Sequence, residues 1–98
     1  MTYELAFDRR ALKEWQKLGH TIREQFKKKL AERLENPRVP AARLHGHADR
    51  YKIKLRASGY RLVYQVIDEK VIDEKVVLLV IAVGRRESSE VYQIADLR

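Results

Sequence analysis

The fold is decided by a stretch in which apolar and basic residues alternate, Tyr51-Lys52-Ile53-Lys54-Leu55-Arg56. Side chains in a β-strand point to opposite faces in turn, so this stretch predicts a strand with one apolar and one basic face. The apolar face must be buried against another layer of the protein. The Ser58-Gly59 pair predicts a turn, and residues 60–67 predict the second strand of a hairpin.

The hairpin is expected to gather cations on one face. With Ser58 and Gly59 as the central turn residues, Arg56 is expected to pair with Arg61. The expected basic face then holds four cations, which are Lys52, Lys54, Arg56 and Arg61. Crowded like charges cost stability in a pure scaffold, so the pattern favours a surface that binds a polyanion. The alternative is a solvated outer face without a ligand.

Two helices are predicted ahead of this hairpin. Asp8 is expected to cap a first helix over residues 9–18, and Gly19 is expected to end it. The Thr21–Glu24 pair is typical of a capping box that opens a second helix, which Asn36-Pro37 ends. Their apolar faces are Ala11, Leu12, Trp15 and Leu18 in the first helix, and Ile22, Phe26, Leu30 and Leu34 in the second.

The remaining elements complete an α+β fold. Residues 2–7 predict an edge or near-edge strand, and residues 76–83 are apolar throughout, as in a central strand buried on both faces. Gly84 is expected to end that strand, and a short C-terminal helix is expected through residues 91–95. The expected architecture is a small antiparallel sheet packed on an N-terminal helical hairpin.

Composition narrows the classes of protein. The 98 residues suffice for one domain, spanning 1–98, and the formal net charge of +7 favours an anionic partner such as a nucleic acid. No cysteine is present, which excludes disulfides and thiolate metal sites and fits the cytoplasm. We expect no signal peptide, and the longest apolar run is too short for a membrane span.

Further candidate residues lie in two segments. Arg85 and Arg86 follow the apolar strand, where a guanidinium can grip a phosphate, and Tyr92 can stack on a base or pass a proton. For Tyr92 the alternative is simple packing. His45 and His47 precede the basic strand without metal-ligand spacing; they are candidate general bases or solvated loop residues.

These residues together resemble a known family, the RelE toxins of bacterial toxin–antitoxin pairs. The similarity covers nearly the whole chain and is carried by residues 7–8, 11–15, 51–56, 59–64, 83–87 and 91–92. It implies a microbial-ribonuclease-like fold and a toxin that enters the ribosomal A site and cuts messenger RNA, using no metal or other cofactor. The 2′-hydroxyl would attack the adjacent phosphate and leave a cyclic phosphate.

The resemblance also implies site residues and partners. Lys52 and Lys54 would activate the nucleophile and hold phosphate, Arg61 and Arg86 would stabilise the charged phosphorane, and Tyr92 would orient the substrate. The residues expected to bind RNA are Arg43, His45, Arg56 and Arg85. The implied partners are the small ribosomal subunit with its A-site messenger RNA and a RelB-like antitoxin, through which the complex would bind operator DNA.

Two features depart from the family pattern. An arginine usually stands where this chain has His45. Residues 66–70, Val-Ile-Asp-Glu-Lys, are also repeated at once as residues 71–75. The alternatives to a ribonuclease are a non-catalytic module that binds nucleic acid or a protein partner, and a gyrase poison on the same scaffold. The basic face argues against the last.

The duplication leads to a prediction. Five extra residues inside a strand would turn every later side chain to the other face, so one copy is expected to lengthen the hairpin before residue 76. Deleting residues 71–75 should leave thermal stability and growth arrest nearly unchanged, because exposed hairpin tips tolerate changes of length. A deletion that unfolds the protein, or that abolishes arrest by a folded one, would place the repeat in the sheet.

Overall fold

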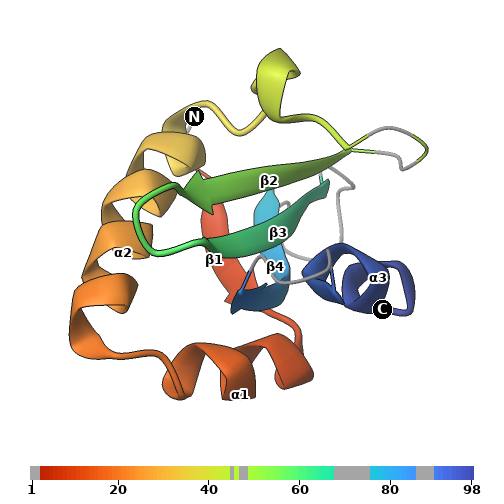
Figure 1. The fold of residues 1–98 in the computed structure, drawn as a ribbon. Coiled ribbons are helices and arrows are strands. Elements are labelled where there is room, and N and C mark those ends of the chain that lie inside the picture. The colour runs from red at the N-terminus through yellow and green to blue at the C-terminus, as the bar shows by residue number, and fades with distance from the viewer. Residues whose placement is uncertain (1–2, 45, 47–48, 68–75, 86–89) are drawn as a thin grey trace.

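A four-stranded sheet lies at the centre of the molecule (Figure 1). The computed structural model describes residues 3–44, 46, 49–67, 76–85 and 90–98. The strands are β1 (Glu4–Phe7), β2 (Arg50–Leu55), β3 (Tyr60–Ile67) and β4 (Val77–Arg85), in the spatial order β1-β4-β3-β2. The expected three-stranded antiparallel meander is confirmed, and β4 is a central strand.

The pair formed by β1 and β4 is parallel, so the sheet is mixed: the meander is antiparallel as expected, and β1 adds a parallel strand at its edge. The cause is the connection between β1 and the meander. Two helices carry the chain back to the start of β1, where the Tyr3 amide donates to the Leu34 carbonyl at 2.9 Å. The strands β2 and β4 therefore run in the same direction as β1.

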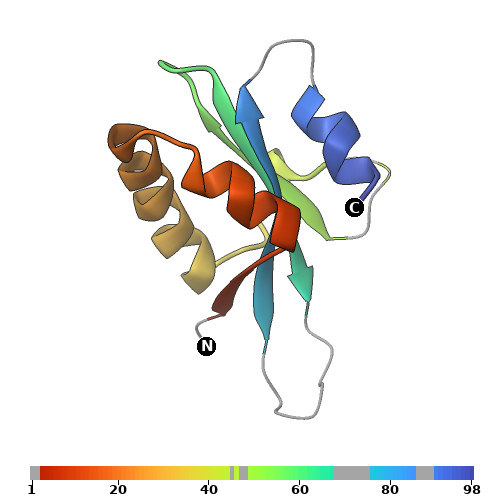
Figure 2. The ribbon, with the colours of Figure 1, turned by 90° about the horizontal axis from the view of Figure 1, so that it is seen from below.

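Helices cover both faces of the sheet (Figure 2). The hairpin of α1 (Arg9–Gln16) and α2 (His20–Glu35) covers one face, and α3 (Glu90–Asp96) covers part of the other. The hairpin layer buries Trp15 between Phe7 and Phe26, with ring centroids 5.3 and 6.1 Å away. The α3 layer is a smaller core of Val63, Ile81, Ala82, Val91 and Ala95.

The expected helical faces are largely confirmed. Ala11, Trp15 and Leu18 are buried in the hairpin core, as are Phe26 and Leu30 of α2. Leu12 was expected in the same stripe, but its side chain is 39% exposed. Each helical residue is rotated by about 100° from the one before it, and the buried pair at i and i+4 turns Leu12 outward.

The predicted ends of the helices were partly wrong. Asp8 caps α1 as expected, but α1 ends at Gln16 and Lys17 is its C-cap. Gly19 has an extended backbone with φ of −65° and is the N-cap of α2, so it does not end α1. The capping box at Thr21 does not form, because α2 already begins at His20 and has no side-chain cap.

The turn between β2 and β3 is longer than predicted. Leu55 pairs with Tyr60 and Lys54 with Arg61, so the expected pairing of Arg56 with Arg61 was wrong. Four residues, 56–59, form the turn, which Gly59 closes by donating its amide to the Leu55 carbonyl at 2.9 Å with a φ of +76°. The change of register is two residues, so Arg61 keeps the face that the sequence predicted.

One irregularity interrupts the pairing of β3 with β4. Val63 lies opposite Ala82 and Tyr64 opposite Val80, which makes Ile81 the extra residue of a β-bulge. Ile81 and Ala82 consequently both pack in the α3 layer, whereas Val83 returns to the hairpin core. The strand continues through Gly84, which was expected to end it, as far as Arg85.

Most of the duplicated segment, residues 68–75, lies outside the described residues. The residues on either side of it, Ile67 and Val77, pair with each other at the ends of β3 and β4. No helix in the described part of the chain has both the length and the apolar character needed to cross a membrane.

The cap of α1 gives a prediction about stability. Asp8 Oδ1 accepts the Arg10 and Ala11 amides at 2.9 and 3.4 Å. Asp8→Ala should therefore lower the free energy of unfolding by about 1 kcal/mol, and Asp8→Asn, which keeps an acceptor, by less. Urea unfolding followed by the fluorescence of Trp15, the single tryptophan, measures both.

The same cap should depend on pH. Burial alone would raise the pKa of Asp8, but the hydrogen bonds from Arg10 and Ala11 outweigh it and lower the pKa on balance. The charged cap therefore stabilises the fold above the pKa of Asp8 in the unfolded chain, and this stabilisation is lost as pH falls through the lower folded pKa. If the difference in free energy of unfolding between wild type and Asp8→Ala stays constant as the pH is lowered into the acid range, this explanation is wrong.

Candidate nucleic-acid interface

Three cations lie together on the sheet face that α3 partly covers. We call the surface of Lys52, Lys54 and Arg61 the cationic face. Lys54 lies directly opposite Arg61 across the β2–β3 pair, which brings their Cβ atoms to about 5 Å. Their neighbours in the strands, such as Ile53 and Leu62, are buried in the hairpin core. The alternation predicted for β2 therefore holds, and Arg61 of β3 lies on the same face as the two lysines, as predicted.

Tyr92 of α3 joins the cationic face. Arg61 Nη1 donates to the Tyr92 hydroxyl at 2.7 Å, and the guanidinium carbon lies 5.6 Å from the centroid of the Tyr92 ring. Val91 and Ala95 on the same helix are buried against the sheet, and they fix the side of α3 that faces Arg61. Two residues that the sequence analysis singled out separately, 31 positions apart, are thus in direct contact.

The other predicted RNA-binding residues are placed differently. Arg56 lies in the turn after β2 and is exposed, next to Lys54 and Arg61 in a shallow hollow of about 320 Å³. Arg43 is exposed and forms an isolated bridge with Tyr51, beside the free edge of β2. The predicted residues His45 and Arg86 lie outside the described residues.

Arg85 is not brought together with these cations. It pairs with Tyr60 at the end of β4, and its guanidinium carbon lies 5.3 Å from the centroid of the Tyr60 ring. Tyr60 packs against the hairpin core, so Arg85 is on the face opposite Arg61. The bulge at Ile81 shifts the alternation of side chains along β4 by one residue, so that Val83 and Arg85 point toward the hairpin side.

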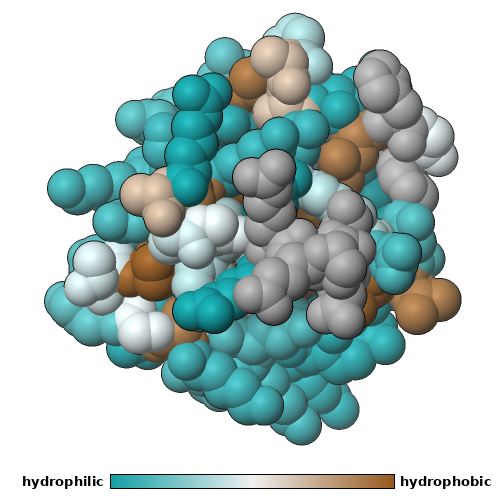
Figure 3. Space-filling model, in the orientation of Figure 1, coloured by the Kyte–Doolittle hydropathy of each residue, from teal (hydrophilic) through white to brown (hydrophobic). Residues whose placement is uncertain are grey.

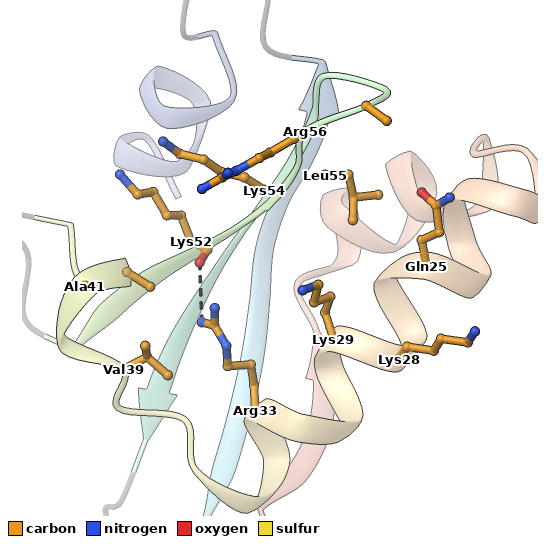
Figure 4. Close-up of a pocket in the computed structure, with 12 residues that line it drawn as sticks. Gln25, Lys28, Lys29, Arg33, Val39, Ala41, Lys52, Lys54, Leu55 and Arg56 are labelled. Carbon is orange, nitrogen blue, oxygen red and sulfur yellow. Dashed lines mark hydrogen bonds between the residues drawn. The ribbon is translucent and has the colours of Figure 1, made fainter.

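A basic groove of about 730 Å³ lies between α2 and β2 (Figure 4). Lys29 and Arg33 extend from α2 toward β2, while the charged ends of Lys52, Lys54 and Arg56 gather farther along the strand. Among the described residues, the lining holds six cations and no carboxylate, with Val39, Ala41, Ala42, Leu55 and Ala57 as its apolar part. Most of the surface in the view of Figure 3 is hydrophilic. The groove thus extends the positive surface from the sheet to α2.

Arg33 is a residue that the sequence analysis missed. Its Nη1 donates to the Tyr64 hydroxyl at 2.9 Å and lies 3.4 Å from the Lys52 carbonyl, so it covers part of the β2 edge. The Tyr64 hydroxyl in turn donates to the Pro37 carbonyl at 2.6 Å. A helical signal was available, since Arg33 follows the buried Leu30 by three positions and so borders the apolar face.

Tyr64 is the buried member of this group. Burial raises the pKa of its hydroxyl above the ordinary value, and the neighbouring Arg33 opposes that shift only in part. Tyr64 therefore stays a neutral donor and acceptor around pH 7, and it ties α2 and the chain at Pro37 to β3. Because Arg33 contacts both the Tyr64 hydroxyl and the Lys52 carbonyl, this arrangement also helps to fix the backbone at Lys52.

The chemistry open to the cationic face is that of fixed positive charge. Arg61, Lys52 and Lys54 can neutralise phosphate oxygens, and the Tyr92 hydroxyl can donate or accept a proton. Among the described residues, no three His, Cys, Asp or Glu side chains gather as a group that could hold a metal ion.

Comparisons with known proteins all identify similar proteins that are toxins of toxin–antitoxin systems. A family model described as the ParE toxin of the type II toxin-antitoxin system, parDE, matches residues 5–90. The protein named mRNA interferase toxin RelE, from Escherichia coli strain K12, is 66% identical over 98 residues, covering 100% of this chain and 98% of that protein.

Solved structures extend the comparison to the fold. A free-state variant of E. coli toxin RelE has a TM-score of 0.86 at 64% identity, covering 100% of this chain and 98% of that chain. A chain of the intact E. coli RelBE toxin–antitoxin complex has a TM-score of 0.77 at 66% identity, covering 87% of this chain and 98% of that chain.

Arginines on the two faces of the sheet allow a matched test of the cationic face. Binding of a single-stranded RNA oligonucleotide, used as a polyanionic probe, is measured as a function of salt concentration. Arg61→Ala should weaken binding and reduce the slope of log K against log salt by about 0.7, the change expected for one lost phosphate contact on a single strand. Arg85→Ala removes the same charge from the opposite face and should leave the slope nearly unchanged. Equal changes of slope in the two variants would show that the RNA does not bind preferentially to the cationic face.

Proposed function

This chain belongs to the RelE/ParE family of type II toxins, and from that membership we propose that it cuts messenger RNA in the A site of the ribosome. The observation that carries the proposal is the cationic face with Tyr92 bonded to Arg61. That face favours a ribonuclease over a gyrase poison, because it can bind and polarise a phosphodiester. The relatives named mRNA interferases point in the same direction.

The proposed reaction is an internal displacement at phosphorus. The 2′-oxygen forms a bond to the adjacent phosphorus, the bond from phosphorus to the 5′-oxygen breaks, and the products are a 2′,3′-cyclic phosphate and a free 5′-hydroxyl. One of Lys52 and Lys54 would accept the proton of the 2′-hydroxyl on a neutral Nζ amine, while the other would hold the phosphate as an ammonium. Arg61 would stabilise the negative charge of the phosphorane, and Tyr92 would orient or stack on the substrate.

Arg86 completes the proposed set. The resemblance of residues 83–87 to the RelE toxins implies that Arg86 would stabilise the phosphorane and deliver a proton to the leaving 5′-oxygen. This division of labour needs no carboxylate pair and no resident metal ion. Fixed cations favour the extra charge of the transition state over the ground state, which is what lowers the barrier.

The groove between α2 and β2 gives the ribosome a place to bind. Lys29 and Arg33 line it on the α2 side and Arg56 on the β2 side, which continues the positive surface away from the cationic face. We propose that phosphates of ribosomal RNA lie along this groove while the codon lies on the cationic face. Such contacts would place the chain in the cytoplasm, with the ribosome holding the substrate in line for attack.

Ribosome dependence is the first test. Purified protein should cut messenger RNA rapidly on programmed ribosomes and poorly when the same RNA is free, because the site has no strong acid–base pair and relies on imposed substrate geometry. Primer extension maps the cuts. Efficient cutting of free RNA, or ribosome binding without any cut, would overturn the proposal; the second result would favour a non-catalytic binding module.

The residue assignment is tested in the same assay. Arg86→Ala should slow cleavage on the order of 100-fold or more, the usual cost of losing one donor to the transition-state charge. Lys52→Ala and Lys54→Ala should also slow it. Arg9→Ala, on the exposed part of α1, is the control for loss of charge alone. If the three site variants cut at the wild-type rate while folded, the assignment is wrong.

We also propose a cognate antitoxin as the partner. A chain with a net charge of +7 and an open basic groove fits an acidic segment that wraps around it and folds on binding. Co-expression with the neighbouring gene should restore growth and yield a complex that co-purifies. Rescue of growth without a physical complex would contradict direct neutralisation.

A further inference from the structure

The strand β4 has an edge that β1 covers only in part. Four residues of β1 pair with Val77 to Val80, and the Asp8 amide then donates to the Val80 carbonyl at 2.8 Å. Beyond this point, two side chains form hydrogen bonds with the backbone of β4. Arg98 Nη1 donates to the Ile81 carbonyl at 2.8 Å, and Glu14 Oε1 accepts the Val83 amide at 3.3 Å. The Ile81 carbonyl belongs to the extra residue of the bulge, the Val83 amide lies two residues farther along, and both are on the part of β4 beyond its pairing with β1.

The same two side chains bind each other. Arg98 donates to both carboxylate oxygens of Glu14, at 2.8 Å through Nη1 and 3.3 Å through Nη2. The Arg98 side chain is 10% exposed and that of Glu14 27%, so the pair is largely sheltered from water. A forked pair of this kind fixes orientation as well as charge. It joins α1, the bulge of β4 and the end of the α3 segment, which are 84 positions apart in the case of Glu14 and Arg98.

The helix that carries Tyr92 depends on such contacts. Seven residues are too few for a helix to persist on its own in water. The amides of Leu97 and Arg98 continue its last turn by donating to Ile94 and Ala95 at 3.1 Å, so an anchored Arg98 also anchors α3. At the other side of α3, Tyr92 receives the hydrogen bond from Arg61.

We propose that Glu14 and Arg98 are positioning residues: by fixing the end of α3 to α1 and to the bulge, they hold the Tyr92 hydroxyl against Arg61. Neither residue belongs to the cationic face, and they act on it through α3. This inference rests on the proposed ribonuclease function for its kinetic consequence. Its structural consequence, the order of α3, is independent of that function.

A double-mutant cycle in single-turnover cleavage of ribosome-bound messenger RNA tests the kinetic part. Arg98→Ala should slow cleavage on the order of 10-fold, because a small misplacement of an orienting group is costly. In a Tyr92→Ala background the same change should have almost no further effect. Glu14→Gln, which keeps an acceptor for Val83 but loses the charge, should act in the same direction and more weakly. Leu97→Ala, whose side chain is 83% exposed, is the matched control.

Amide hydrogen exchange tests the structural part without any cleavage. In Arg98→Ala, the amides of residues 92–95 should exchange at least several-fold faster, while those of Val63 and Tyr64 in β3 keep their wild-type protection. Equal losses of activity in both backgrounds, or unchanged exchange in α3, would overturn the positioning role. If the wild type cuts no RNA, the proposed function fails, and the exchange result still decides whether the pair orders α3.

Discussion

The alternation of side chains along β2 and β3 ties burial to charge. Ile53 and Leu62 can stay in the hairpin core only if their neighbours Lys52 and Arg61 point to the other side. A slip of one residue would bury cations and expose the apolar side chains, at a cost of many kcal/mol. The hydrophobic energy that holds the sheet on α1 and α2 therefore also holds the cations together, against their mutual repulsion.

The bulge at Ile81 adapts this alternation to the third layer. By placing two successive residues, Ile81 and Ala82, under α3, it gives a seven-residue helix enough apolar surface to pack on. On the other edge of β4, beyond the end of β1, Glu14 and Arg98 form hydrogen bonds with the Val83 amide and the Ile81 carbonyl. Tyr92 reaches Arg61 as a result of this packing. The chemistry of the face is thus set by the sheet, by one inserted residue and by one short helix.

The sequence allowed the parts of this arrangement with a local period or a local cap to be predicted, namely the alternation of β2, the apolar β4 and the Asp8 cap. The β2–β3 register was missed by two residues, because the turn is set by where Gly59 adopts its positive φ. The contacts of Arg33 with Tyr64 and of Glu14 with Arg98 could not be predicted. These contacts join residues that are 31 and 84 positions apart. No local sequence pattern indicates which of the many charged residues come into contact.

In the proposed reaction, fixed cations on one sheet face promote attack by the substrate's own 2′-hydroxyl. The most direct measurement is the single-turnover rate of cleavage on programmed ribosomes with a messenger RNA that carries one 2′-deoxynucleotide at the cut site. We expect this substitution to abolish the cut while binding to the ribosome is unchanged, and we expect the all-ribose RNA to yield a 2′,3′-cyclic phosphate. Cleavage of the deoxy-substituted site at a similar rate would contradict this mechanism, because the nucleophile would then be another group.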